Sequence, residues 1–175
     1  MTPARSQTRS FTLIELIVVT VITVILAALS VPVLANGSAR RLSRAAHELA
    51  MHIKLARDLA VATRRTTWVD FDVAADSYSI YIEDPDTPGR PNRISATNPV
   101  TGDDFDVTLD TGEFDGVEIS SAGFGGRPEV EFDRLGKPYD GVGNALASDG
   151  TAVLTAGGAT RTVRVVQDTG LVKED

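Results

Sequence analysis

Glu15 is the one ionisable residue in residues 11–35, an otherwise apolar or small-residue stretch. A carboxylate inside hydrocarbon is costly, about 2.5–3.5 kcal/mol at the centre of an inserted helix. Glu15 lies one turn from the start of this stretch, so one interpretation is an acid tolerated near a membrane surface. The other is that a cation meets it. Residues 11–35 contain no lysine or arginine, so that cation would come from a chain terminus or from another subunit.

Other residue types that could do chemistry give weaker patterns. His47 and His52 are five apart, which places them on different faces of a helix rather than at the spacing of a zinc pair. Acids that could offer oxygen ligands to calcium occur at positions 84, 86, 103, 104 and 106, without the spacing of a dedicated loop. The sequence has no cysteine and no nucleophile or phosphate-loop motif. We therefore expect no enzyme activity, no metal and no cofactor.

The distribution of charged residues divides the 175-residue chain into four zones, and Glu15 lies in the second. Residues 1–10 carry two arginines and no acid, and residues 11–35 are apolar. Residues 36–65 hold seven basic and two acidic residues, a net charge of +5. Residues 66–175 hold eight basic and twenty-one acidic residues, a net charge of −13, within a chain of net charge −7. That acidic balance argues against general nucleic-acid binding.

Residues 11–35 are long enough for a transmembrane helix. At about 1.5 Å per residue they would span roughly 37 Å, against a hydrocarbon core of about 30 Å. A cleaved secretory signal is the alternative, although its apolar core is usually only about 7–15 residues long. Pro32 is expected to kink the helix. Ser38, after Asn36 and Gly37, could start a fresh helix.

An amphipathic helix is predicted over residues 36–65, because small and apolar side chains recur there at spacings of three and four. These are Leu42, Ala46, Leu49, Ile53, Ala56 and Ala60. Alternation predicts a β-hairpin of Thr67–Val73 and Ser77–Ile82 around residues 74–76. Residues 83–104 contain four prolines and are expected to form a long surface loop. Further strands are predicted at 105–109, 117–120, 129–133, 151–155, 160–166 and 171–173, with a turn at Gly157-Gly158 and turns over 123–126 and 135–144. Seven or eight strands are therefore expected.

The string from Ser10 to Val19, S-FTLIELIVV, after a short basic leader, resembles the signal of type IV prepilins and pseudopilins. The resemblance implies that a prepilin peptidase cuts between Ser10 and Phe11 and that Phe11 is then N-methylated. It makes Glu15 the fifth mature residue, where the family keeps a glutamate thought to pair with the amino terminus of a neighbouring subunit. Pro32 falls where many members have a kinking proline. Ser10 departs from the family's usual glycine, and slower cleavage is expected.

The rest of the chain resembles the H-type minor pseudopilins of type II secretion and their fimbrial relatives. The similar passages are residues 55–81, with A-R-x-x-A before the first hairpin; 130–141, with F-x-x-x-G-x-P; and 161–175, around a T-G turn. The resemblance implies an α+β pilin-like fold, in which a long N-terminal transmembrane and amphipathic helix packs on an antiparallel β-rich head. The expected divisions are leader 1–10, transmembrane and assembly helix 11–35, helix extension 36–65 and periplasmic head 66–175.

The function implied is that of a structural subunit of a type II secretion pseudopilus, held in the inner membrane with its head in the periplasm until it joins a filament. Expected partners are other pseudopilins or pilins, the prepilin peptidase and methylase, and an inner-membrane assembly platform. Two alternatives stay open. One is a fimbrial minor pilin that binds DNA, for which Arg161 and Arg164 could form a local basic patch. The other is a signal-anchored periplasmic binding module.

Overall fold

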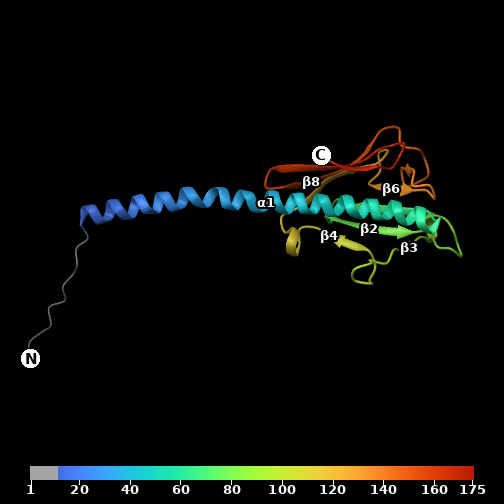
Figure 1. Cartoon of the computed structure of the whole chain (residues 1–175), viewed down its shortest axis with the longest axis horizontal. Helices are drawn as coiled ribbons and strands as arrows, with labels where there is room; N and C mark the ends of the chain where they lie inside the picture. The colour runs from blue at the N-terminus through green and yellow to red at the C-terminus, as the bar shows by residue number, and fades with distance from the viewer. Residues whose placement is uncertain (1–11) are drawn as a thin grey trace, which may run out of the picture. The chain divides into compact units, whose positions relative to one another are not determined.

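One long helix, α1 (Leu13–Thr63), dominates the computed structural model, which describes the backbone of residues 12–175 and the side chains of residues 12–26 and 37–175. The helix ends where Arg64 adopts a left-handed backbone with φ of 55°. The chain divides into two units, one up to Gly37 and one from Ser38 to Asp175. Because α1 runs on through residues 36–38, Ser38 does not start a new helix (Figure 1).

The first sheet is antiparallel and six-stranded, in the order β3-β2-β1-β6-β7 with β4 also paired to β2. Its strands are β1 (Thr67–Asp72), β2 (Ser77–Ile82), β3 (Ile94–Ser95), β4 (Asp106–Thr108), β6 (Glu129–Phe132) and β7 (Pro138–Tyr139). The predicted hairpin is confirmed, with Val69 opposite Ile80. Asp72 Oδ1 accepts hydrogen bonds from the backbone N–H groups of Ala74 and Ala75, which fixes the turn.

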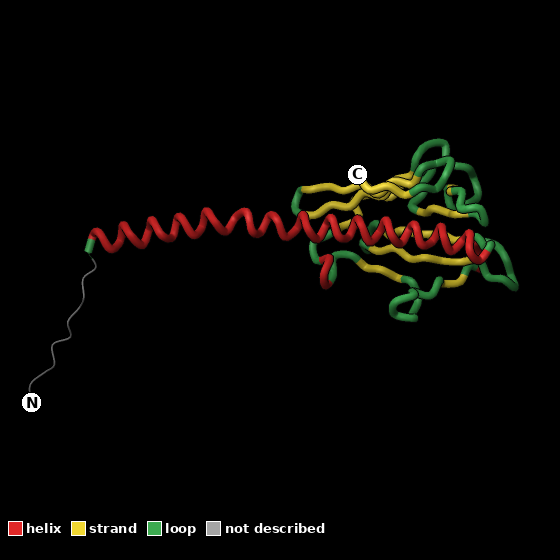
Figure 2. The backbone as a smooth tube through the Cα atoms, in the orientation of Figure 1, coloured by secondary structure: helices red, strands yellow, loops and turns green. Residues whose placement is uncertain are grey.

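The second sheet is four-stranded and antiparallel, in the order β10-β9-β8-β5. Its strands are β5 (Glu118–Gly123), β8 (Gly150–Ala156), β9 (Ala159–Val165) and β10 (Val172–Glu174). The β8–β9 hairpin turns at Gly157-Gly158, as predicted, and both glycines have positive φ. A Cβ on Gly157 would lie 2.6 Å from Ser38 Oγ, so this turn sits directly against α1. Figure 2 distinguishes the helices, strands and loops by colour.

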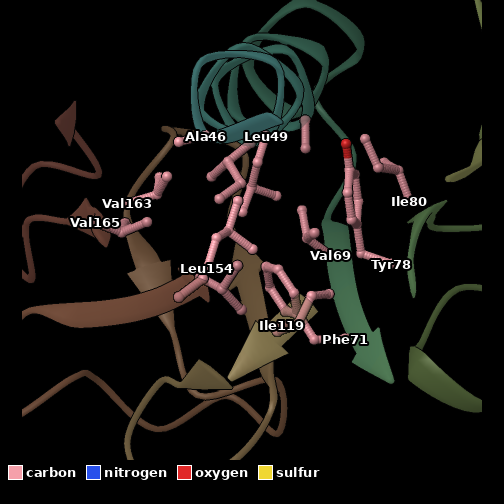
Figure 3. Packing of buried hydrophobic residues seen from close by; sticks show 14 of the residues in the cluster. Ala46, Leu49, Val69, Phe71, Tyr78, Ile80, Ile119, Leu154, Val163 and Val165 are labelled. Carbon is pink, nitrogen blue, oxygen red and sulfur yellow. The ribbon is translucent and has the colours of Figure 1, made fainter. Parts of the chain in front are cut away.

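The core of the unit from Ser38 onward lies between α1 and both sheets (Figure 3). All six residues of the predicted helical stripe are buried, with exposed fractions of 0–1%. The first sheet contributes Val69, Phe71, Tyr78 and Ile80, and the second contributes Ile119, Leu154, Val163 and Val165. Thr67 Oγ1 donates to the Ala56 carbonyl, which ties β1 to the helix. The predicted α+β fold of a long helix on an antiparallel β-rich head is confirmed.

Three details of the prediction were wrong. Val73 lies in the turn rather than in the first strand, because the four-residue turn begins one residue earlier. Residues 83–104 are not all loop: they contain a short 3-10 helix, η1 (Arg90–Asn92), and β3, which pairs with the free edge of β2. Residues 135–144 are not all turn, because β7 pairs with β6. The described residues form ten strands in all, and a second 3-10 helix, η2 (Gly112–Phe114), precedes β5.

Candidate functional site

The first turns of α1 present an apolar surface on every side. In an ordinary globular protein an amphipathic helix buries one apolar stripe, whereas a helix that is apolar all round requires an apolar environment. Eleven large apolar side chains between residues 13 and 26 are each at least half exposed. They are Leu13, Ile14, Leu16, Ile17, Val18, Val19, Val21, Ile22, Val24, Ile25 and Leu26. Exposed apolar area of this extent marks a surface that contacts lipid or other protein chains.

The hydroxyl groups within this segment are satisfied inside the helix. Thr20 Oγ1 donates to the carbonyls of Leu16 and Ile17, at 3.0 and 2.9 Å. Thr23 Oγ1 donates to the Val19 carbonyl at 2.7 Å. Such bonds to the preceding turn let threonine lie in an apolar helix without an unpaired hydroxyl. The helix surface is therefore less polar than its sequence suggests.

Glu15 lies in the first turn of α1 with an exposed side chain. Its backbone N–H donates to Thr12 Oγ1 at 3.3 Å, so Thr12 caps the helix. An acid in the first turn is favourable for the helix, because the backbone N–H groups at that end carry partial positive charge. This geometry leaves the carboxylate available to an external cation.

The other residues predicted to act at the N-terminal end cannot be placed in the same way. The leader 1–10, including Ser10, and Phe11 lie outside the described residues. The backbone at Pro32 is helical, and its side chain lies outside those described. Among the residues that the structure describes, no helix is both long and apolar enough to cross a membrane.

The two histidines lie in different surroundings, as their spacing predicted. His47 is exposed, with Nδ1 3.5 Å from Glu174 Oε2 at the edge of the second sheet. His52 is half-buried: its Nδ1 lies 2.7 Å from the Tyr78 hydroxyl and its ring meets Phe105 edge-on. Burial lowers the pKa of His52 and raises that of the Tyr78 hydroxyl. Both histidines act as packing or surface residues in this arrangement.

Among the acidic loop residues considered as calcium ligands, Asp84 is bonded within its own loop. Asp84 accepts hydrogen bonds from the Asp86 N–H and the Thr87 hydroxyl, and these bonds lower the pKa of Asp84. In the part of the chain that the structure describes, no three histidine or acidic side chains gather as a metal site. On the basic side, Arg164 forms an ion pair with Asp175 at 2.5 Å, which offsets part of its charge.

Sequence reasoning missed a charge cluster around one buried acid on the first sheet. The Glu129 carboxylate, 4% exposed, forms ion pairs with Arg90 and Arg93 from the loop between β2 and β3. Arg93 also pairs with Asp70 at 2.7 Å. Burial raises the pKa of the neighbouring Glu131, whose Oε2 accepts a hydrogen bond from Trp68 Nε1. The sequence shows two arginines three residues apart, but it does not show their partner, because Glu129 lies 36 to 39 residues further along the chain.

Comparison with solved structures shows the fold. The minor pseudopilin EpsH of the type 2 secretion system of Vibrio cholerae aligns with 77% of this chain and 96% of its own length, at 13% identity and a TM-score of 0.56. A second EpsH structure gives 12% identity, 77% and 93% coverage and the same TM-score. The type IV minor pilin FimU of Pseudomonas aeruginosa aligns over 78% of this chain and 89% of its own, at 19% identity and a TM-score of 0.49. A search of curated protein sequences gives no match.

The long helix, the antiparallel head and the apolar first turns together define a pilin-like subunit. The family model for the type II transport protein GspH matches residues 45–170, which is more than half of the sequence. The chain therefore belongs to the GspH family. A model of the prokaryotic N-terminal methylation motif matches residues 5–31. The role of the chain is that of a structural subunit of the minor pseudopilin or pilin class, not of an enzyme.

Proposed function

We propose that the chain is a minor pseudopilin of a type II secretion system. Residues 11–35 hold it in the inner membrane as a single span, with the head in the periplasm, until it joins a short filament. The observation that carries this proposal is the match of residues 45–170 to the GspH family, joined to an apolar helix that begins at residue 13. Neighbouring pilin-like subunits and an inner-membrane assembly platform are the partners this role requires.

Processing at the N-terminus is the first step of the proposed function. The methylation-motif match over residues 5–31 supports cleavage between Ser10 and Phe11 by a prepilin peptidase, followed by N-methylation of Phe11. Ser10 is small, so it suits a narrow peptidase subsite, and we expect cleavage to be slower than after glycine. The new terminus would lie four residues before Glu15.

Assembly then uses Glu15 and the apolar side chains around it. Residues 11–35 supply no cation of their own, so the amino terminus of a neighbouring subunit is the proposed partner of the Glu15 carboxylate. In hydrocarbon an unpaired carboxylate is costly, and pairing therefore favours one axial register of packed helices. Pro32 removes one backbone donor and would bend the helix near the end of the span that faces the head.

The test of processing is the intact mass and N-terminal sequence of the protein purified from its native membrane. We expect a chain that begins at N-methylated Phe11. A chain that retains residues 1–10 would contradict processing and point to a signal-anchored module. A chain cut near residue 36 would show a secreted protein and overturn the proposed function as a whole.

The test of assembly is Glu15→Ala, with Asp58→Ala as the matched control. Asp58 is an exposed acid on the same helix, 60% exposed, within the head unit. We expect Glu15→Ala to lower the subunit recovered in filaments about tenfold, equivalent to about 1.4 kcal/mol of lost pairing, while Asp58→Ala has no effect. Protease resistance of the head should be the same in both. Wild-type recovery of Glu15→Ala in filaments would remove the pairing mechanism.

A further inference from the structure

The segment from Asp84 to Arg93, which we call the strap, crosses the first sheet without anchoring itself in the core. All ten of its residues are described, and none of their side chains is buried. The strap includes η1, which likewise buries no residue. A segment that buries no apolar side chain gains little from packing, so its attachment must come from polar contacts.

Those polar contacts converge on one carboxylate. Arg90 donates from Nη2 to Glu129 Oε2 at 2.5 Å and from Nε at 3.2 Å. Arg93 donates to Glu129 Oε1 from the other side and to Asp70 Oδ2 at 2.7 Å. Glu129 sits in a close-fitting site, because a Cβ on Gly141 would lie 2.7 Å from its carboxylate. Glu129 therefore acts as the latch that holds both arginines.

Trp68, on the sheet face beside this latch, is buried although it faces away from the core. Val69 and Phe71 of β1 point into the core, whereas Trp68 lies on the other face and is still only 2% exposed. Its cross-strand neighbour is Tyr81, and the Arg93 guanidinium lies 4.2 Å above the Tyr81 ring. The Trp68 indole N–H is bonded to Glu131. The strap thus contributes to covering an aromatic and acidic surface.

We propose that the strap opens as a unit, with Glu129 as its latch, and uncovers Trp68 and Tyr81 while the helix and both sheets stay folded. No strap residue belongs to the core cluster, so release of the strap leaves the packing of α1 on the sheets intact. Opening breaks the contacts of two arginines with Glu129 and Asp70, together with the stacking of Arg93 on Tyr81. Local opening of a weakly packed segment below the global unfolding transition is the behaviour this arrangement dictates.

Trp68, the only tryptophan of the chain, is the cross-strand neighbour of the Tyr81 ring that Arg93 covers, and it serves as the reporter of opening. The experiment compares acrylamide quenching of Trp68 fluorescence in the full chain in detergent micelles, for wild type and Glu129→Gln. Glutamine keeps the volume of glutamate and removes the charge that holds both arginines. We expect quenching to rise several-fold in Glu129→Gln with an unchanged far-UV circular dichroism spectrum. Glu113→Gln, which removes an exposed acid paired with Arg44, is the matched control and should quench as wild type does.

Wild-type quenching in Glu129→Gln would overturn the proposal, and so would a rise that comes only with loss of the circular dichroism signal. A second measurement needs no variant: wild type is titrated with urea and followed by both signals. We expect Trp68 quenching to increase at lower urea than the circular dichroism transition. Coincident transitions would show that the strap unfolds only with the whole head and would equally overturn the proposal.

Discussion

Adding one methyl group at Gly150 should destabilise the head, because Gly150 lies against a buried ring. A Cβ at this position would lie 2.1 Å from Phe124 Cδ1 and 2.8 Å from Cε1, closer than atoms can approach. Phe124 is fully buried and stacks on Phe71, with ring centroids 5.5 Å apart and an interplanar angle of 18°. The ring cannot move aside without disturbing Phe71, which itself packs against the core.

The magnitude follows from the cost of overfilling a packed core, about 1–3 kcal/mol for added methyl or methylene groups. Gly123 on the neighbouring strand β5 is the matched control, in register with Thr151 of β8. No atom lies within 4 Å of a Cβ built there. Alanine at an unstrained glycine position usually stabilises by about 0.4–1 kcal/mol, because the unfolded chain loses conformational freedom. The two variants should therefore shift stability in opposite directions.

Equilibrium urea unfolding of the full chain in detergent micelles, followed by far-UV circular dichroism, measures both variants. The expected midpoint is lower than wild type for Gly150→Ala and equal or higher for Gly123→Ala. A change for Gly150→Ala of less than about 0.5 kcal/mol, the range of ordinary surface substitutions, would refute the packing argument. Equal destabilisation by both variants would refute it too, because it would reflect a general intolerance of strand glycines.

Three further perturbations have expected outcomes. Ile53→Ala should cost about 2–5 kcal/mol of unfolding free energy by urea titration, since Ile53 is fully buried, whereas Met51→Ala, 54% exposed, should stay within about 0.5 kcal/mol. Gly37→Ala should stabilise α1 by about 0.8–1 kcal/mol and slow amide hydrogen exchange around residue 37, because no atom opposes a Cβ there; unchanged exchange would contradict this. Burial lowers the pKa of His52 from 6.5, so at mildly acidic pH the unfolded chain binds more protons than the folded one. The free energy of unfolding should therefore fall as pH drops from about 7.5 to 5.5. His52→Gln should lack that part of the pH dependence.

Local sequence patterns predicted the helix and the strands whose formation depends on the spacing of their own apolar side chains. The spacing of Leu42 through Ala60 identified the buried face of α1, because a helix repeats its faces every 3.6 residues. Alternation of Val69 and Phe71 with Asp70 identified β1 and its partner. By contrast, β3 and β7 are two residues long and form because β2 and β6 offer free edges, which no local pattern reveals.

Long-range charge pairing was beyond the sequence as well. In the sequence Glu129 looks like an ordinary acidic residue of a strand. Its ion-pair partners, Arg90 and Arg93, lie in a loop 36 to 39 positions earlier in the chain. The identity of Glu15 as a candidate site rests instead on composition: one charge in an apolar stretch is visible without any fold. The structure adds that its carboxylate is exposed in the first turn, with the helix capped by Thr12.

The continuous stripe of α1 has a mechanical consequence for the unit from Ser38 onward. From Leu42 to Ala60 the stripe extends about 27 Å, and each of its residues packs within the core formed with both sheets. A pull along the helix axis would load these contacts together, in shear, rather than peeling them away one at a time. Rupture would then require the whole row to slip at once, so the head should be far stiffer against axial tension than against a force that lifts α1 sideways.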